Sequence, residues 1–238
     1  MKFPAKLVKG RLLKRYKRFL ADIELESGEM VTAHCANPGS MLGLKEPGIT
    51  VWLSPAQNPD RKLKWDWQLS EVEIHGNRAL VGINTNHPNA IVADAIEAGQ
   101  VSELTGYGGV RREVKYGKNS RIDILLEEEG KAPCYVEVKN VHLLRDKGKA
   151  EFPDSVTARG AKHLGELADM VAEGHRAVMF YLVQRDDADH MELADDIDPA
   201  YAEAFTKAHK AGVEAVAYCC KLGVDGIELD RRIEFIAP

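Results

Sequence analysis

Two neighbouring strand-like segments of this chain carry acidic residues at mirrored positions. Residues 120–126 and 134–141 both have the apolar character of β-strands, and the segment between them is polar and contains Gly and Pro, as hairpin loops do. If the loop is centred on Gly130, Asp123 lies opposite Glu137, because each is seven residues from that pivot. The sequence therefore predicts two carboxylates side by side on a β-hairpin.

Lys139 joins the two acids, since the two-residue period of a strand places it on the same face as Glu137. Like charges that face each other destabilise a sheet, and a divalent cation with hard oxygen ligands would remove that penalty. The alternative is a surface hairpin with an ordinary Glu–Lys pair, of which residues 113–115 give another example. Aliphatic residues are expected on the other face of the hairpin: Ile122, Ile124, Val136 and Val138.

This arrangement resembles the core motif of the PD-(D/E)XK nuclease superfamily. The resemblance implies that Asp123 and Glu137 bind Mg²⁺ (or Mn²⁺) and that Lys139 orients or activates the attacking water. Asp94, in the first expected helix, is a further candidate metal ligand, although the superfamily pattern leads us to expect Glu there. Glu113 on the preceding strand faces either this site or solvent.

The order of elements after residue 80 agrees with that motif. Helix and strand patterns alternate there, and the order helix–strand–strand–strand–helix–strand is the αβββαβ core of the same superfamily. We therefore expect a nuclease-like domain over residues 81–238. The expected elements are a helix at about 88–98, strands at about 110–116, 120–127 and 133–143, a helix at about 156–173, a strand at 177–183, a helix at about 199–211 and a strand at 213–221.

The first 80 residues instead contain short strand-like runs separated by turn signals. Few helical patterns occur there, so a small β-barrel of the OB type is expected over residues 1–80. The chain is thus predicted to combine an all-β barrel with an α/β domain. The expected barrel strands are 6–13, 18–26, 30–36, 49–55 and 64–74.

The charge of the chain is unevenly distributed. The net charge is −5, yet residues 1–20 contain eight Lys and Arg residues and no acid. Such a basic segment is typical of phosphate binding, and a solvated strand edge protected by lysines is the alternative. Candidate DNA contacts are Lys9, Arg11, Lys14, Arg15, Lys17 and Arg18 in this segment, Lys64, Trp65 and Trp67 in the last barrel strand, and Arg121, Arg159 and His163 beside the expected metal site.

The tryptophans and the residues beside the expected metal site are candidates for different reasons. Trp65 and Trp67 share one strand face and either stack on unpaired bases or fill the barrel core. Arg121 is expected opposite Lys139, where a bound phosphate would relieve their repulsion. Arg159 and His163 are one helical turn apart, on a rim that either contacts phosphate or is merely solvated.

Cysteine spacing and hydropathy indicate the compartment. The chain has four cysteines without C-x-x-C spacing, no apolar run of 18 residues and no apolar segment after its charged N-terminus. We expect free thiols, no zinc site, no signal peptide and a cytoplasmic protein that does not cross a membrane.

Seven motifs spread over the chain resemble the sugar fermentation stimulation protein A family. The resemblance implies a bacterial or archaeal cytoplasmic protein with an OB-like and a nuclease-like domain, which binds DNA without sequence preference and is linked to the regulation of maltose metabolism. The motifs are Asn37-Pro38-Gly39-Ser40-Met41, Pro88-Asn89, residues 112–117, Ser120-Arg121-Ile122-Asp123, residues 136–141, Phe152-Pro153-Asp154 and residues 157–164.

Three function classes remain open from the sequence. The first is a divalent-metal-dependent DNA nuclease, with single strands among its candidate substrates. The second is a DNA-binding regulator without catalysis, and the third is a regulator that acts through protein partners. Recognition of one operator sequence is disfavoured, since no helix-turn-helix pattern is seen.

Overall fold

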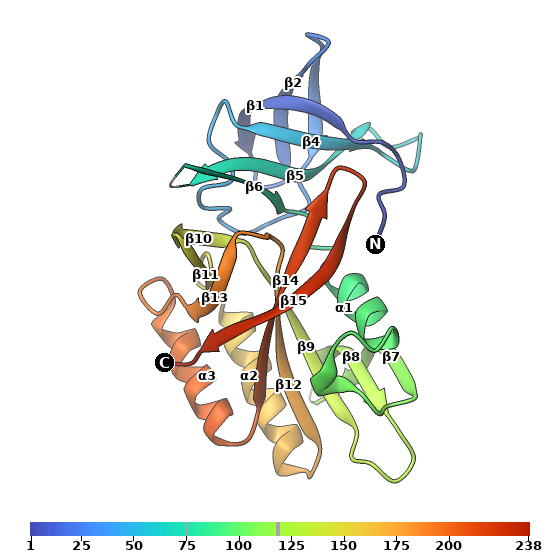
Figure 1. The fold of residues 1–238 in the computed structure, drawn as a ribbon, viewed down its shortest axis with the longest axis vertical. Coiled ribbons are helices and arrows are strands. Elements are labelled where there is room, and N and C mark those ends of the chain that lie inside the picture. Colours follow the sequence, from blue (N-terminus) through green and yellow to red (C-terminus); the bar gives the residue numbers. More distant parts are fainter. Residues whose placement is uncertain (75, 118–119) are drawn as a thin grey trace.

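The computed structural model describes residues 1–74, 76–117 and 120–238. The described chain forms a β-barrel followed by a large twisted sheet that carries helices on both faces (Figure 1). The expected combination of an OB-type barrel and a nuclease-like α/β domain is confirmed.

The barrel closes through a pairing between strands that are distant in sequence. Its sheet has the order β3-β2-β1-β4-β5-β6, and a parallel pairing of β3 with β5 joins the ends of a five-stranded barrel. All five expected strands are present, and an additional strand, β6, follows them. A domain boundary at residue 80 stays a prediction, and β6 crosses that position. The strands are β1 (Val8–Tyr16), β2 (Leu20–Leu25), β3 (Met30–His34), β4 (Thr50–Pro55), β5 (Trp65–Ile74) and β6 (Asn77–Gly82).

The barrel interior decides between the two interpretations of the tryptophans. Trp67 is fully buried, and its indole Nε1 donates a hydrogen bond to the carbonyl oxygen of Leu69 (3.0 Å). It therefore cannot stack on DNA bases, and its prediction as a DNA contact is wrong, because its side chain packs within the barrel core. Trp65, two residues earlier, is half-buried at the end of the barrel.

The C-terminal part is built on a nine-stranded sheet with the order β10-β11-β13-β15-β14-β12-β9-β8-β7. The expected αβββαβ order is confirmed, and four strands that extend the sheet (β10, β11, β13 and β15) were not predicted. The elements are α1 (Pro88–Glu97), a 3-10 turn η1 (Ser102–Leu104), β7 (Gly109–Tyr116), β8 (Ser120–Glu127), β9 (Cys134–Val141), β10 (Leu143–Asp146), β11 (Gly148–Phe152), α2 (Ala158–Ala172), β12 (Arg176–Val183), β13 (Ala188–Leu193), α3 (Pro199–Lys210), β14 (Glu214–Gly223) and β15 (Gly226–Ile236).

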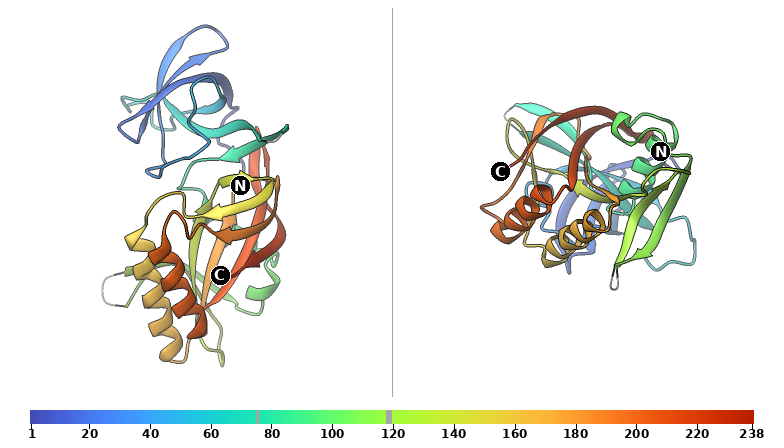
Figure 2. Two further views of the ribbon diagram at one scale, coloured as in Figure 1. Left: turned by 90° about the vertical axis from the view of Figure 1, so that its left-hand side faces the viewer. Right: turned by 90° about the horizontal axis from the view of Figure 1, so that it is seen from below.

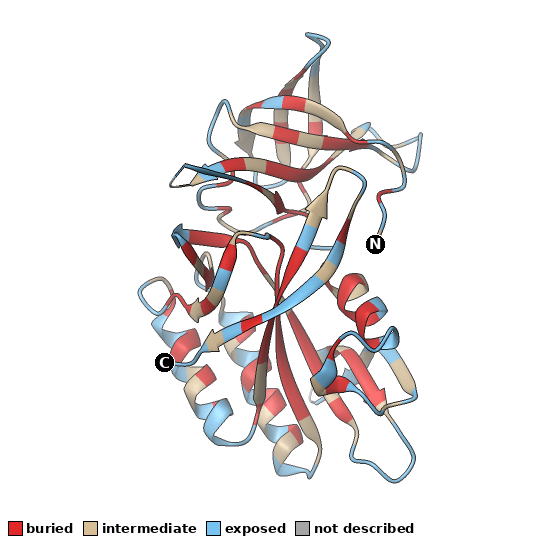
Figure 3. Ribbon diagram, in the orientation of Figure 1, coloured by how far each residue is buried: buried red, intermediate tan, exposed pale blue. Residues whose placement is uncertain are grey.

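The helices divide the sheet's apolar residues into two cores. Helices α2 and α3 lie side by side on one face, and α1 covers the other (Figure 2). Between them β12 is buried along nearly its whole length (Figure 3), as its continuous apolar sequence predicts. Helix α2 begins after Thr157, whose side-chain oxygen accepts a hydrogen bond from the backbone N–H of Gly160.

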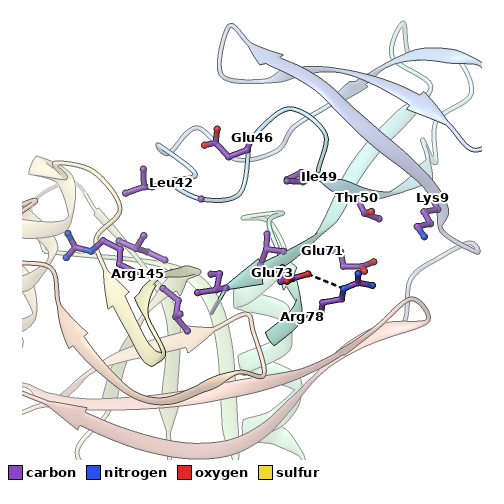
Figure 4. A pocket seen from close by; sticks show the side chains of 14 residues that line it. Lys9, Leu42, Glu46, Ile49, Thr50, Glu71, Glu73, Arg78 and Arg145 are labelled. Carbon is purple, nitrogen blue, oxygen red and sulfur yellow. Dashed lines mark hydrogen bonds and ion pairs between the residues drawn. The ribbon is translucent and has the colours of Figure 1, made fainter. Parts of the chain in front are cut away.

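The barrel and the sheet are joined by hydrogen bonds that backbone N–H groups of the N-terminal part donate, and they border one large cleft. The N–H of Met41 donates to Asp154 Oδ2 (2.7 Å), and that of Gly82 donates to the carbonyl of Gln184 (2.8 Å). A cleft of about 830 Å³ lies between β5 and the β10 strand (Figure 4), and its walls include Ile74 and Leu144. None of the residues that line this cleft is a predicted metal ligand.

The four cysteines are all buried as free thiols. Within the described ranges, no helix is long and apolar enough to span a bilayer.

Candidate active site

The predicted hairpin register is present in the structure. Strand β8 pairs antiparallel with β9 so that Ile124 lies opposite Val136. The same register places Asp123 at the level of Glu137, as the mirrored sequence positions indicate.

The register does not continue toward the start of β8. The β8–β9 ladder ends at Ile124, so Arg121 has no ladder partner on β9, while on the other side of β8 it pairs with Lys115 of β7. The prediction that Arg121 lies opposite Lys139 is therefore wrong, because β8 diverges from β9 at this point. Ile122 also departs from the prediction, since it packs in the core beneath α2 rather than in the core beneath α1.

The carboxylate of Glu137 is the buried centre of the site. The residue is only 2% exposed, and its Oε1 accepts a hydrogen bond from Lys139 Nζ (2.7 Å) and contacts His163 Nδ1. Burial raises the pKa of Glu137, but the hydrogen bonds and charges of His163 and Lys139 outweigh it and hold the pKa below its usual range. Glu137 is therefore ionised while buried.

Asp123 is held by two hydrogen bonds. Its Oδ2 accepts from the backbone N–H of Val138, and its Oδ1 accepts from the amide of Asn89, each at 2.7 Å. Burial, together with the charge of Glu137, raises the pKa of Asp123 to about 6. The charge of Glu137 thus opposes the ionisation of Asp123.

One oxygen of this pair lacks a partner. Glu137 Oε2 is buried without a hydrogen bond from any residue within the described ranges. A buried carboxylate oxygen in that state is costly unless a ligand satisfies it. A cation that takes hard oxygen ligands and keeps several waters, as Mg²⁺ does, fits a pair of carboxylates with one open oxygen. No group of three or more His, Cys, Asp or Glu side chains suited to a metal occurs in the described part of the chain.

Helix α1 reaches the site through Asn89 and not through Asp94. Asp94 is exposed, and it lies about 140° around the helix from Asn89, which contacts Asp123. The prediction of Asp94 as a metal ligand is therefore wrong, because its side chain is on a different side of α1 from the site. Asn89 belongs to the Pro-Asn motif but was given no role from the sequence.

His163 has a different role from the one predicted. It is 5% exposed and lies against Glu137, so it cannot contact DNA from a solvated rim. Arg159, one turn earlier on α2, is exposed and donates from Nε to His163 Nε2 (3.3 Å). Because Arg159 is exposed and contacts His163, it lies at the surface beside the site.

Two further buried polar groups accompany the site. Glu166 of α2 accepts a hydrogen bond from Ser120 Oγ at Oε1 (2.8 Å), while its Oε2 and the hydroxyl of Tyr116 have no partner among the described residues. The pKa of Tyr116 is raised by burial and by the neighbouring charges of Glu137 and Glu166. The three-residue spacing from His163 to Glu166 on one helix face was the sequence signal for this acid.

Half of the bases in the N-terminal segment have partners within the barrel. Three of its cations face acids of β2 or of the residue that follows it: Arg11 with Glu24 (2.5 Å), Lys14 with Asp22 (3.5 Å) and Lys9 with Glu26 (3.8 Å). Arg15 donates to the carbonyl oxygens of Asn37 and Gly39. The segment is thus not a stripe of free positive charge, because acids face three of its eight bases and a fourth, Arg15, is held by carbonyl oxygens.

Lys17, Arg18 and Phe19 lie exposed at the turn between β1 and β2, and Phe19 is 51% exposed. Phe19 also lines a groove of about 750 Å³ with Trp65 and the exposed Lys64. This groove combines aromatic side chains with cations at the surface. Exposed Lys62 also lines it.

The chain matches two family models. One, described as the "Sugar fermentation stimulation protein RE domain", matches residues 86–226, and the "SfsA N-terminal OB domain" matches residues 13–83. A sugar fermentation stimulation protein homolog of Paramagnetospirillum magneticum is 60% identical over 96% of this chain and 95% of its own length. The homolog of Azorhizobium caulinodans is 56% identical over 99% and 100%. A solved structure, SfsA of Pyrococcus furiosus in complex with Ca²⁺, superposes with a TM-score of 0.87 at 25% identity and covers 99% of this chain and 98% of that one.

Proposed function

We propose that this chain, which belongs to the sugar fermentation stimulation protein family, binds DNA without sequence preference and cleaves its phosphodiester bonds with Mg²⁺ or Mn²⁺. The observation that carries the proposal is the unpartnered Oε2 of buried Glu137 beside Asp123. A buried pair of carboxylates that lacks a counter-charge at one oxygen is suited to a divalent cation. The Pyrococcus furiosus relative was solved in complex with Ca²⁺, which supports a cation in this family.

Asp123 and Glu137 would hold the cation. When bound, it would offset the negative charge that develops on the phosphate during displacement. Asp123 keeps a free lone pair on each oxygen, because each oxygen accepts one hydrogen bond.

The ammonium group of Lys139 can act on the substrate directly. Its ammonium has three protons, of which one is donated to Glu137. The side chain is 14% exposed, so the remaining protons can reach a phosphate oxygen or the attacking water. Charge-assisted hydrogen bonds of this kind stabilise charge developing in the transition state. Arg159 at the adjacent surface is a second phosphate contact in this proposal.

The barrel groove is the proposed binding platform. Phe19 and Trp65 would stack on bases, while Lys62 and Lys64 would contact phosphates. Base stacking does not read sequence and requires unpaired bases, so we propose a preference for single strands or single-stranded ends. Within the basic segment of residues 1–20, Lys17 and Arg18 are the strongest candidates for DNA contact, because they lie at an exposed turn.

End-labelled single-stranded, duplex and branched DNA, incubated with the purified protein and Mg²⁺, Mn²⁺ or no metal, tests this function. We expect metal-dependent cleavage by the wild type and none by Asp123→Asn or Glu137→Gln. Glu129→Gln is the matched control, since Glu129 is an exposed acid in the loop of the same hairpin. If the wild type binds DNA but cleaves no substrate with either ion, the nuclease assignment fails and a non-catalytic DNA-binding regulator remains.

A further inference from the structure

An acid of β7 lies directly opposite Asp123. The pairs Arg112↔Ile124 and Val114↔Ile122 flank this level of the β7–β8 ladder, so Glu113 stands across from Asp123. Because Asp123 is itself level with Glu137, acids occupy the same level on three adjacent strands. Such a row of like charges opposes sheet formation unless other groups bridge it.

The backbone is strained at this level. Glu113 has φ of +54°, a left-handed conformation that a residue with a side chain seldom adopts. The strand reverses its faces here: Val110 packs with the core beneath α1, and Val114 packs with the core beneath α2. Strand β8 reverses at the same level, between Ile122 and Ile124. The reversal is thus shared by the two strands that carry the facing acids.

A single amide bridges the two acids. Asn89 Nδ2 donates to Asp123 Oδ1 (2.7 Å) and to Glu113 Oε1 (3.2 Å). An amide NH₂ has two protons, so these contacts use its full donor capacity and fix the plane of the amide. Helix α1 thereby sets the orientation of Asp123, and Glu113 sets the orientation of Asn89.

We propose that Asn89 and Glu113 are positioning residues that orient the carboxylate of Asp123 toward the cation. The inference rests on the proposed function, since it concerns the same metal site. Groups that hydrogen-bond to metal ligands affect metal affinity by about 10–100-fold without touching the metal. A purely structural role for Asn89 in anchoring α1 would instead change stability and leave affinity unchanged.

The geometry separates two roles that Glu113 could have. A Gln side chain keeps the oxygen that accepts from Asn89 but removes the negative charge, and an Ala side chain removes both. If Glu113 positions Asn89, Glu113→Gln binds metal within about twofold of the wild type, whereas Glu113→Ala binds about 10-fold more weakly. Glu113 is exposed, so both variants are expected to fold.

Calorimetric titration of the full-length protein with Mn²⁺, with thermal unfolding of the same metal-free samples, tests the inference. We expect Asn89→Ala to weaken Mn²⁺ binding by about 10-fold or more. The unfolding midpoint is expected to fall as well, because the Asp123 carboxylate also loses a hydrogen-bond donor, so the Mn²⁺ affinity is the deciding measurement. Asp94→Asn is the matched control, because it removes an exposed acid from the same helix on another side, and it should bind like the wild type.

The outcomes are distinguishable from those of the proposed function. Wild-type protein that binds no Mn²⁺ contradicts both. Wild-type binding that is unchanged in Asn89→Ala and Glu113→Ala contradicts the positioning role alone. Equal weakening in Glu113→Gln and Glu113→Ala would also overturn it, because the charge rather than the hydrogen bond would then matter.

Discussion

His163 of α2 lies against the buried carboxylate of Glu137, with Nδ1 in contact with the oxygen that also accepts from Lys139. The helix therefore contributes to the state of the carboxylate pair on the sheet. Together the His163 and Lys139 contacts hold the pKa of Glu137 below its usual range despite burial.

Removing His163 should destabilise the protein and impair the site. In His163→Ala the buried carboxylate loses one donor, which costs roughly 1–3 kcal/mol of unfolding free energy. Metal-dependent cleavage should fall as well, since the Glu137 carboxylate is no longer fixed. Urea denaturation and a cleavage assay measure the two effects. His163→Asn, which can place an amide donor near the position of Nδ1, should recover part of both; an Asn variant as impaired as the Ala variant would count against this hydrogen bond.

The raised pKa of Asp123 predicts a pH dependence of metal-free stability. The folded state holds the proton up to pH of about 6, whereas the unfolded chain releases it near the ordinary value of 3.8. Between these values the folded state binds more protons, so this group's contribution to stability falls as pH rises, by up to about 3 kcal/mol. Asp123→Asn should remove that part of the slope. Urea denaturation of both proteins from pH about 4 to 7 in a chelator provides the comparison, and parallel curves would contradict the assignment.

Substitutions in the barrel groove should weaken binding to single strands. Phe19→Ala and Trp65→Ala are each expected to lose roughly 1–3 kcal/mol of affinity for a single-stranded oligonucleotide, since each removes a stacking platform. Affinity should fall roughly 50-fold between about 50 and 200 mM salt if Lys17, Arg18, Lys62 and Lys64 contact four phosphates. Fluorescence anisotropy measures both. Met30→Ala, at an exposed apolar residue outside the groove, is the control, and equal losses there would argue against a local platform.

Glu113→Gly should make the metal-free protein more stable and the site weaker. Glycine adopts a positive φ at little cost, so the unfolding free energy is expected to rise by about 1 kcal/mol. The variant loses the acceptor for Asn89, so Mn²⁺ affinity should drop as in Glu113→Ala. A variant that is no more stable than Glu113→Ala in urea would show that the left-handed backbone carries no strain.

Local symmetry made part of this site predictable. Asp123 and Glu137 are related by a short hairpin, and a loop of seven residues leaves few registers that bury the aliphatic side chains. The αβββαβ order followed from hydrophobic periodicity. Strands β13 and β15 were missed because acids and bases alternate with their buried residues, and the acid-rich segment 186–198 concealed the first of them.

Contacts that depend on packing between elements could not be predicted. The spacing of His163 relative to Leu164 and Leu167 indicates a helix rim, but Glu137 on the sheet turns that rim into a buried contact. Asn89 acquires its role only because α1 lies over the level at which β7 and β8 reverse their faces. In contrast, the pairing of Arg11 and Lys14 with acids of β2 could have been predicted from the sequence, because it follows from the register of the β1–β2 hairpin.

DNA affinity without metal, measured beside cleavage with metal for the same variants, separates a metal-dependent nuclease site from a patch of surface charge. Asp123→Asn and Glu137→Gln should abolish Mg²⁺-dependent cleavage and bind metal-free DNA as tightly as the wild type or more tightly, because each removes a charge that repels phosphate. Lys139→Ala should also stop cleavage but weaken binding by about 1 kcal/mol, since it loses a charge-assisted hydrogen bond. We therefore expect only Lys139→Ala to weaken DNA affinity, with cleavage lost in all three variants. Wild-type protein that cleaves no DNA with Mg²⁺ or Mn²⁺, together with three variants that bind DNA like the wild type, would refute the nuclease site.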